Sequence, residues 1–167
     1  FADGLRLDVA HRLSRELEGL GFGVNGDWEW STIPTVTATA KPAASPMADH
    51  AQGGEDGAEF ATRLAANGQA LTQERFLGKL KDLGWQCLGP DEVGSPSGSA
   101  WTEFGTLDKR GHNEGWKLAR AVAGEVRDLA GRIGALLRAG WTEVLVVTDH
   151  GWLLMPGGLP KIELKSF

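Results

Sequence analysis

The chain has 167 residues and a net charge of −5, and 41% of its residues are hydrophobic. This composition is ordinary for a globular protein with one core, and it argues against a large basic surface for duplex DNA or an anionic membrane. No apolar run approaches the roughly 18 residues that a membrane-spanning helix needs, so no membrane partner is expected. The single cysteine, Cys87, cannot form a disulfide within the chain, and a reducing cytoplasm is therefore the expected compartment.

Apolar spacing and turn signals predict the elements in the first half of the chain. The helical repeat is clearest over residues 5–20, and Gly21 stands where such a helix would end. After Pro34, only a first helical turn from about Thr37 is expected, because further prolines follow and interrupt a helix. A strand region, a mobile loop, a short helix and a longer helix are expected at residues 22–33, 47–58, 59–68 and 71–83, in that order.

The second half alternates strand and helix. Residues 85–88 have strand composition, and residues 89–99, rich in Gly, Pro and Ser, are expected to form a second mobile loop. The strongest helical repeat covers residues 113–139, Gly140 follows it, and the β-branched run 143–148 predicts a buried strand. Because a helix, a tight turn and a buried strand make half of a βαβ unit, we expect an α/β fold with a mostly parallel sheet and flanking helices.

The run Val144-Leu-Val-Val-Thr-Asp-His-Gly151 ends this strand with an adjacent carboxylate and imidazole. Asp149 and His150 would lie just past the carboxyl end of the strand, where open α/β sheets place their ligand sites. One carboxylate oxygen and one imidazole nitrogen on consecutive residues suit Zn²⁺ or a similar divalent ion. The alternative interpretation is a polar turn after a strand.

Two further acidic positions could extend this candidate metal site. Asp3, followed by Gly4, would end a strand whose beginning is missing, although a helix cap is the alternative role for such an aspartate. Asp108 and His112 are four residues apart in a predicted loop before the long helix, so both could turn toward one ion. A solvated loop with a chance histidine is the alternative.

The segment Ile33-Pro-Thr-Val-Thr-Ala-Thr-Ala-Lys41 contains three alternating threonines. An edge strand after a proline is one interpretation of this pattern. The functional interpretation is a hydroxyl nucleophile at a strand-to-helix turn, activated by a divalent ion because a threonine alcohol is a weak nucleophile at neutral pH. Lys41 could attract a phosphate, and a solvated surface lysine is the alternative.

Taken in order, these motifs resemble the alkaline phosphatase superfamily: Asp-Gly, a threonine nucleophile, Asp-x-x-x-His, a long helix, and a strand ending in Asp-His-Gly. Within this superfamily, three segments are most similar to the PglZ domain of BREX phage-defence systems. They are Phe1-Ala-Asp-Gly-Leu-Arg6, Pro34-Thr-Val-Thr-Ala-Thr-Ala-Lys-Pro42 and Thr148-Asp-His-Gly-Trp152. The resemblance implies an alkaline-phosphatase-like three-layer sandwich. Residues 1–167 would be a single domain of this kind or, since both ends look cut, an incomplete fragment of its core.

The resemblance also implies a role for each candidate residue. Asp3, Asp149 and His150 would hold one divalent ion, Zn²⁺ or alternatively Mn²⁺ or Mg²⁺. The same ion would bind Thr37, the catalytic nucleophile, with Thr35 or Thr39 as substitutes. Asp108 and His112 would hold a second ion, whose third ligand is normally a histidine downstream of Asp-His-Gly. The sequence has no such histidine.

The implied activity is that of a metal-dependent phosphatase or phosphodiesterase, a hydrolase acting on a phosphate ester such as a nucleotide or a nucleic acid. Its partners would be other BREX components such as a DNA methyltransferase. A phosphomutase or another phosphohydrolase would share these motifs, whereas the Cys/Ser-x-Pro-x-Arg motif of the sulfatase branch does not occur. The alternative outside enzymes is a catalytically degenerate scaffold or a nucleotide-sensing module of the defence complex.

Overall fold

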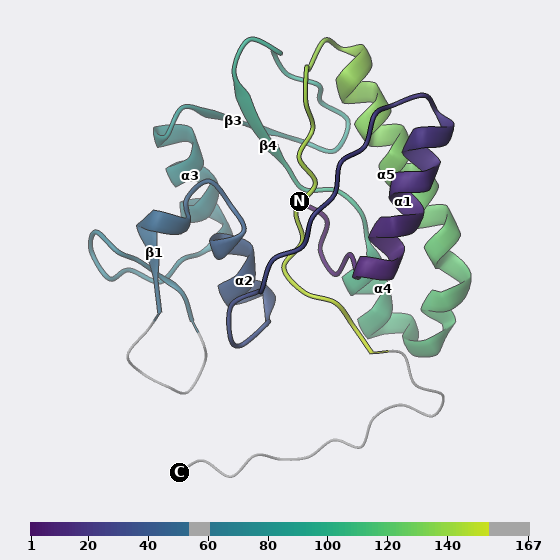
Figure 1. The fold of residues 1–167 in the computed structure, drawn as a ribbon. Coiled ribbons are helices and arrows are strands. Elements are labelled where there is room, and N and C mark those ends of the chain that lie inside the picture. Colours follow the sequence, from purple (N-terminus) through teal and green to yellow (C-terminus); the bar gives the residue numbers. More distant parts are fainter. Residues whose placement is uncertain (54–60, 154–167) are drawn as a thin grey trace.

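The computed structural model describes residues 1–53 and 61–153 and shows a mixed α/β chain (Figure 1). In chain order the elements are α1 (Leu7–Gly19), α2 (Thr37–Ala43), the 3₁₀ helix η1 (Ala48–His50), β1 (Ala51–Gln52), β2 (Arg63–Leu64), α3 (Gln73–Asp82), β3 (Trp85–Leu88), β4 (Ser99–Thr102), α4 (Leu107–Glu114), the 3₁₀ helix η2 (Gly115–Lys117) and α5 (Leu118–Arg138). Strands β1 and β2 pair antiparallel, and β3 and β4 pair parallel. Among the described residues, no helix combines the length and apolar character that crossing a membrane requires.

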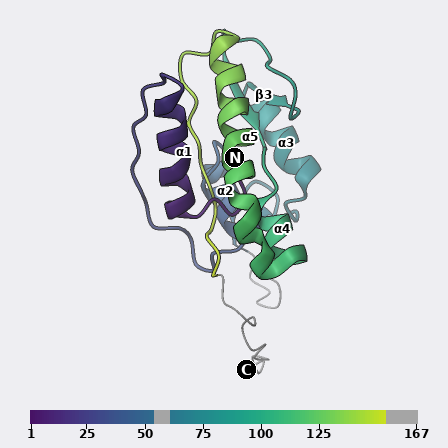
Figure 2. The same cartoon turned by 90° about the vertical axis from the view of Figure 1, so that its right-hand side faces the viewer.

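Helices α1 and α5 run side by side in both views and share one apolar cluster (Figures 1 and 2). The apolar positions of both helices recur every three or four residues, which places them on one stripe that faces the other helix. The buried members from these two helices are Val9, Leu13 and Leu17 of α1, and Leu118, Val122, Val126, Leu129, Ala130 and Ile133 of α5. The predicted helices at 5–20 and 113–139 are thus confirmed with shorter bounds, and Gly21, with φ of +86°, follows the first.

A second apolar cluster lies where α3 packs against β3 and β4. Its buried members are Met47, Phe76, Leu80 and Trp101. Helix α3 begins where the Thr72 hydroxyl accepts a hydrogen bond of 3.3 Å from the Arg75 amide and so caps the helix. The helix predicted at 71–83 and the strand predicted at 85–88 are confirmed.

The first two residues continue the parallel pairing beyond β4. The amino group of Phe1 donates to Thr102 O at 2.7 Å, and the Phe104 amide donates to Phe1 O at 3.0 Å, which is the pattern of a parallel ladder. The Ala2 amide donates to Val147 O at 2.9 Å. Residues 1–2 therefore lie between β4 and the segment 144–148. The chain that follows β4, the chain that follows Ala2 and the chain that follows Thr148 all leave from the same edge of this arrangement.

Four predictions about strands, helices and the sheet are wrong. No strand is assigned within 22–33 or 143–148, because strand pairing needs a partner and the second segment has only the bond from Ala2. In the region predicted as a helix at 59–68, the described residues form β2 and a turn, since the chain there pairs with β1. The predicted mostly parallel sheet is not seen either, because the assigned strands form two small sheets, one of them antiparallel.

The two predicted loops contain more structure than expected. Residues 48–52 of the first form η1 and β1, and residues 54–58 lie outside the described part of the chain. The second ends where β4 begins at Ser99. Its irregular part is held by the buried Arg132 of α5, which donates to Gly89 O at 3.1 Å and to Glu92 O at 2.6 Å.

Replacing Leu13 with alanine should destabilise the fold by about 2–5 kcal/mol, because a fully packed leucine loses its contacts and leaves a cavity between α1 and α5. Leu13 is 3% exposed, whereas Leu7 on the same helix is 53% exposed. Leu7→Ala is therefore the matched control, with an expected change within about 0.5 kcal/mol. Urea unfolding followed by circular dichroism measures both. Equal effects of the two substitutions would contradict the packing described for α1.

Candidate metal centre

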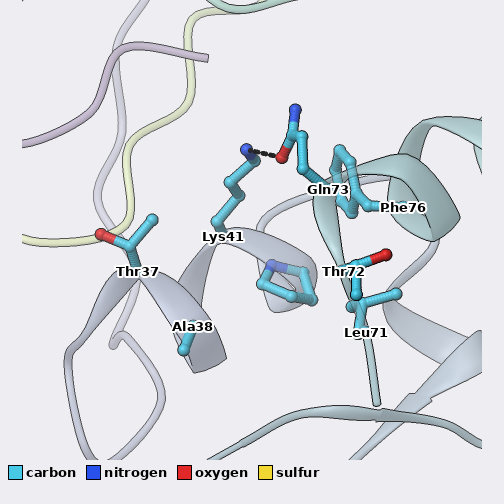
Figure 3. A pocket seen from close by; sticks show the side chains of 8 residues that line it. Thr37, Ala38, Lys41, Leu71, Thr72, Gln73 and Phe76 are labelled. Carbon is cyan, nitrogen blue, oxygen red and sulfur yellow. Dashed lines mark hydrogen bonds between the residues drawn. The ribbon is translucent and has the colours of Figure 1, made fainter. Parts of the chain in front are cut away.

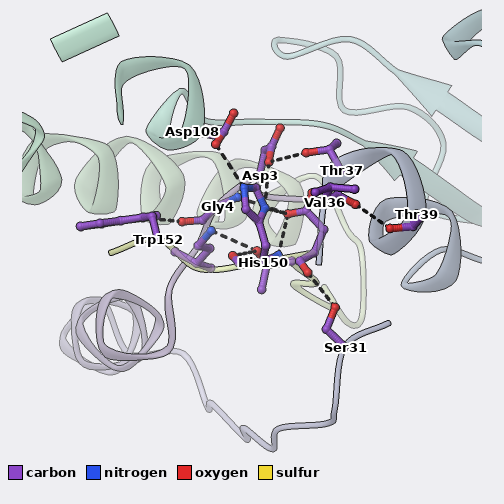
Figure 4. Close-up of polar contacts among 12 residues, drawn as sticks. Asp3, Gly4, Ser31, Val36, Thr37, Thr39, Asp108, His150 and Trp152 are labelled. Carbon is purple, nitrogen blue, oxygen red and sulfur yellow. Dashed lines mark hydrogen bonds and ion pairs between the residues drawn. The ribbon is translucent and has the colours of Figure 1, made fainter. Parts of the chain in front are cut away.

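Three segments that leave the common edge bring Asp3, Asp108 and His150 together (Figure 4). One ligand atom from each residue lies within 4.8 Å of the other two. His150 Nδ1 is 3.6 Å from Asp3 Oδ1, and His150 Nε2 is 3.2 Å from Asp108 Oδ1. The histidine therefore lies between two carboxylates that come from the turn before α1 and from the first turn of α4.

The carboxylate of Asp149, which is 2% exposed, orients this histidine. Its Oδ1 accepts hydrogen bonds from the amides of Gly4 (3.3 Å) and His150 (2.9 Å), and lies 2.8 Å from His150 Nδ1. Its Oδ2 is buried and has no hydrogen-bond partner among the described residues. Because leaving a buried polar atom unpaired costs about 1–3 kcal/mol, this oxygen marks a point at which a cation or a donor is needed.

Thr37 is the first residue of α2, and its hydroxyl lies 3.5 Å from Asp3 Oδ1. The edge-strand interpretation of the threonine segment is wrong, because residues 33–36 are not strand and Thr39 lies within the helix. The Thr39 hydroxyl donates to Pro34 O at 2.6 Å and turns to the main chain instead of the cluster. Thr37, and not Thr39, is therefore the threonine whose hydroxyl lies at the cluster.

His112 lies at the rim of the cluster. Residues 108–112, which were predicted to form a loop, belong instead to α4, the helix that begins at Leu107. Within this helix, His112 Nε2 lies 3.4 Å from Asp108 Oδ1, one turn away. The His112 side chain is 79% exposed, so the structure encloses Asp108 within the cluster and leaves His112 on the solvent side.

Lys41 points into a network on the other side of α2. Its ammonium donates to Gln73 Oε1 and to Glu103 Oε2, both at 2.8 Å, and its side chain is 11% exposed. The solvated-lysine interpretation is therefore wrong, and the ammonium is already neutralised by Glu103. Lys41 and Thr37 line a pocket of about 140 Å³, but the Thr37 hydroxyl points away from Lys41 and Gln73 (Figure 3).

The close packing of charges shifts the ionisation of the cluster. Burial, and then the negative charges of Asp149 and Asp108, raise the pKa of Asp3 to about 6. Burial by itself lowers the pKa of His150, but its hydrogen bond and charge contact with Asp149 outweigh burial and raise that pKa overall. Burial likewise opposes ionisation of Asp149, and the hydrogen bond and charge of His150 reverse this and lower the Asp149 pKa. An excess of negative charge is thus concentrated where a divalent cation would neutralise it.

Two residues without a predicted role hold Asp108 in place. Gly4 has φ of +68°, and a Cβ there would lie 3.2 Å from the Asp108 Cβ, so glycine permits the turn after Asp3 to approach α4. Glu125 of α5 accepts hydrogen bonds from the Thr106 amide (3.0 Å) and hydroxyl (2.7 Å), just before α4 begins. The need for a glycine after Asp3 could be predicted from the Asp-Gly pair in the sequence. Nothing in the sequence indicates that Glu125 contacts Thr106.

Comparisons with protein-family models, with curated proteins and with solved structures find no match for this chain. The interpretation of the cluster therefore depends on its own geometry and chemistry. The resemblance to the alkaline phosphatase superfamily stays a prediction from the ordered motifs.

Glu125→Gln should destabilise the protein at pH 7 and have little effect at low pH. Burial opposes ionisation of Glu125, but the hydrogen bonds from Thr106 and Arg110 lower its pKa in the folded chain. Because the folded pKa is below the unfolded value of about 4.3, the stabilisation is complete above that value and is lost as pH falls through the folded pKa. Urea unfolding at pH 7 and below about pH 4 measures this, with the exposed Glu16→Gln as the control. An equal loss at both pH values would contradict the expected role of the carboxylate charge.

Proposed function

We propose that this chain is a metal-dependent phosphoesterase-like domain in which Asp3, Asp149 and His150 hold a divalent ion. The observation that carries the proposal is the convergence of these side chains: one ligand atom each of Asp3, Asp108 and His150 lies within 4.8 Å of the other two, and Asp149 Oδ1 lies 2.8 Å from His150 Nδ1, so that Asp108 lies beside the proposed ion. The buried, unpartnered Oδ2 of Asp149 supports it, because a carboxylate oxygen in that state fits a cation. Carboxylate oxygens with an imidazole nitrogen suit Zn²⁺, with Mn²⁺ or Mg²⁺ as alternatives.

Thr37 is the proposed nucleophile toward a phosphate ester. When bound, the ion would neutralise charge on the phosphate and favour the ionised threonine. The Thr37 hydroxyl lies within 3.5 Å of the Asp3 carboxylate, which is therefore in reach of the hydroxyl proton. In the proposed reaction the Thr37 hydroxyl passes its proton to Asp3 and its oxygen bonds to phosphorus, while the ester bond breaks and the leaving oxygen takes a proton from water and departs as the alcohol. Water then hydrolyses the phosphothreonine, releases phosphate and restores Thr37. The bonds from Gly4 and His150 to Asp149 keep the imidazole oriented throughout.

The proposal extends to the fold and the family: the chain is proposed to be an alkaline-phosphatase-like sandwich of the PglZ type from a BREX system. Such a protein would be cytoplasmic and would act with partners such as a DNA methyltransferase. The proposed fold has one support in the structure. It is supported by the parallel alignment of β3, β4 and residues 1–2, with the cluster at the carboxyl edge, where α/β folds bind ligands. The competing function is a catalytically degenerate scaffold or nucleotide-sensing module. The exposure of His112 favours that alternative, because it leaves Asp108 without an enclosed second partner for another ion.

The protein should bind about one divalent ion per chain, and Asp3→Asn and His150→Gln should each remove it, because each deletes a ligand of the same ion. His112→Gln is the matched control and should retain the ion, since this histidine is exposed at the rim. Metal content by mass spectrometry after dialysis against zinc or manganese measures all four proteins. Folding of each variant is checked by circular dichroism. No bound ion in the wild-type protein would overturn the metal centre and favour the scaffold.

Thr37→Ala should reduce hydrolysis of p-nitrophenyl phosphate and bis-p-nitrophenyl phosphate on the order of a thousandfold or more, while metal content stays unchanged. Thr37→Ser should keep part of the activity, because it retains a hydroxyl at the same position. Thr39→Ala is the control, since its hydroxyl bonds to the main chain and faces away from the cluster. Full activity of Thr37→Ala would exclude this residue as the nucleophile.

A further inference from the structure

The segment that leads from α1 to Thr37 exposes three large apolar side chains. Trp30 is 91% exposed, Ile33 is 96% exposed and Trp28 is 63% exposed. The two tryptophan rings contact each other edge to face, with centroids 5.7 Å apart. Contact between positions i and i+2 is the spacing of an extended chain, in which alternate side chains share a face. Residues 27–33, called the tryptophan strip below, thus expose Trp28 and Trp30 to solvent on one face and Ile33 on the other.

The main chain of the strip makes a local hydrogen bond, from the Trp28 amide to Asp27 Oδ1 at 2.8 Å. Within the described part of the molecule, no hydrogen bond joins the main chain of residues 23–33 to the main chain of another segment. The strip is anchored by the Ser31 hydroxyl, which donates to Asp149 O at 2.9 Å (Figure 4). It runs beside the segment that carries Asp149, at the outer side of the molecule (Figures 1 and 2). Unpaired amides and carbonyls along an extended edge are a template for an added strand.

The charged side chains of the tryptophan strip indicate which kind of strand would pair with it. Asp27 and Glu29 alternate with the tryptophans, both are exposed, and residues 22–33 contain no lysine or arginine. In an extended chain, the acidic side chains lie on the face opposite to the rings. A strand that alternates basic and apolar residues would therefore place its charges beside the carboxylates and its apolar side chains beside the rings. A second copy of the same strip would instead place acidic side chains next to each other, which opposes self-pairing.

We propose that the tryptophan strip is a docking edge for an extended segment of a partner protein in which basic and apolar residues alternate. The partner adds as a strand along residues 27–33. Its main chain bonds to amides and carbonyls of the strip that no other described segment pairs, its basic side chains pair with Asp27 and Glu29, and its apolar side chains cover Trp28 and Trp30. This docking edge is independent of the phosphoesterase proposal, since it needs neither a metal ion nor Thr37.

The test uses a labelled peptide of about eight residues that alternates lysine and valine, a length typical of one strand. Two further peptides serve as comparisons: one replaces lysine with glutamate, and the other carries N-methyl groups on the amides of one edge. Fluorescence anisotropy against the whole chain should show the lysine peptide binding at least about tenfold more tightly than either comparison. Equal binding of the glutamate peptide, or of the methylated peptide, would overturn the proposal.

Variants of the protein locate the binding. Trp28→Ser/Trp30→Ser, and separately Asp27→Asn/Glu29→Gln, should each weaken binding of the lysine peptide by about tenfold or more. Trp116→Ser is the matched control, because Trp116 is also exposed, at 52%, and lies outside the strip. Unchanged thermal unfolding is expected for all variants, since the substituted side chains face solvent. Wild-type binding by the double tryptophan variant would overturn the proposal. So would a dimer in sedimentation velocity that this variant abolishes, because a second copy would then be the occupant.

Discussion

Hydrogen bonds from Phe1 to Thr102, from Phe104 to Phe1, and from Ala2 to Val147 join three segments that are far apart in the sequence. The candidate site depends on this alignment. Because the segments lie in parallel, Asp3, α4 with Asp108, and the pair Asp149-His150 all follow from one edge. Side chains of adjacent residues in these segments also pack on opposite sides, one against α1 and α5 and the other against α3. Ala2 and Val146 pack with α1 and α5, whereas Phe1 and Val147 pack with α3.

The cluster held at this edge is electrostatically unfavourable by itself. The carboxylates of Asp3, Asp108 and Asp149 surround one imidazole, and the raised pKa of Asp3 is the consequence. Asp149 is buried and the other two carboxylates are partly buried, and such a group persists where a cation, or protons, compensate its charge. Ion binding would therefore stabilise the fold as well as supply chemistry, since the ligands come from segments that only folding brings together.

The tryptophan strip and the metal centre share one structural link, the hydrogen bond from Ser31 to the carbonyl of Asp149. The strip also continues directly into Pro34 and α2, whose first residue is Thr37. A strand added along the strip would restrain the main chain on both sides of this link. Partner docking would thus be coupled to the geometry of the threonine through continuous main chain, without any residue of the site touching the partner.

Local pattern in the sequence determined the helices. The apolar repeats around Val9, Phe76 and Val126 act within a few residues, and so α1, α3 and α5 could be predicted. The residues of the cluster could also be named, because Asp3 and Asp149-His150 stand next to glycines where apolar segments end. Tertiary structure alone decided which segments pair, since residues 22–33 and 143–148 have strand composition and form no assigned strand. It also separated Asp108, which is enclosed, from His112, which is exposed, because Asp108 is covered by Gly4 and His150 from distant segments and not by its own helix.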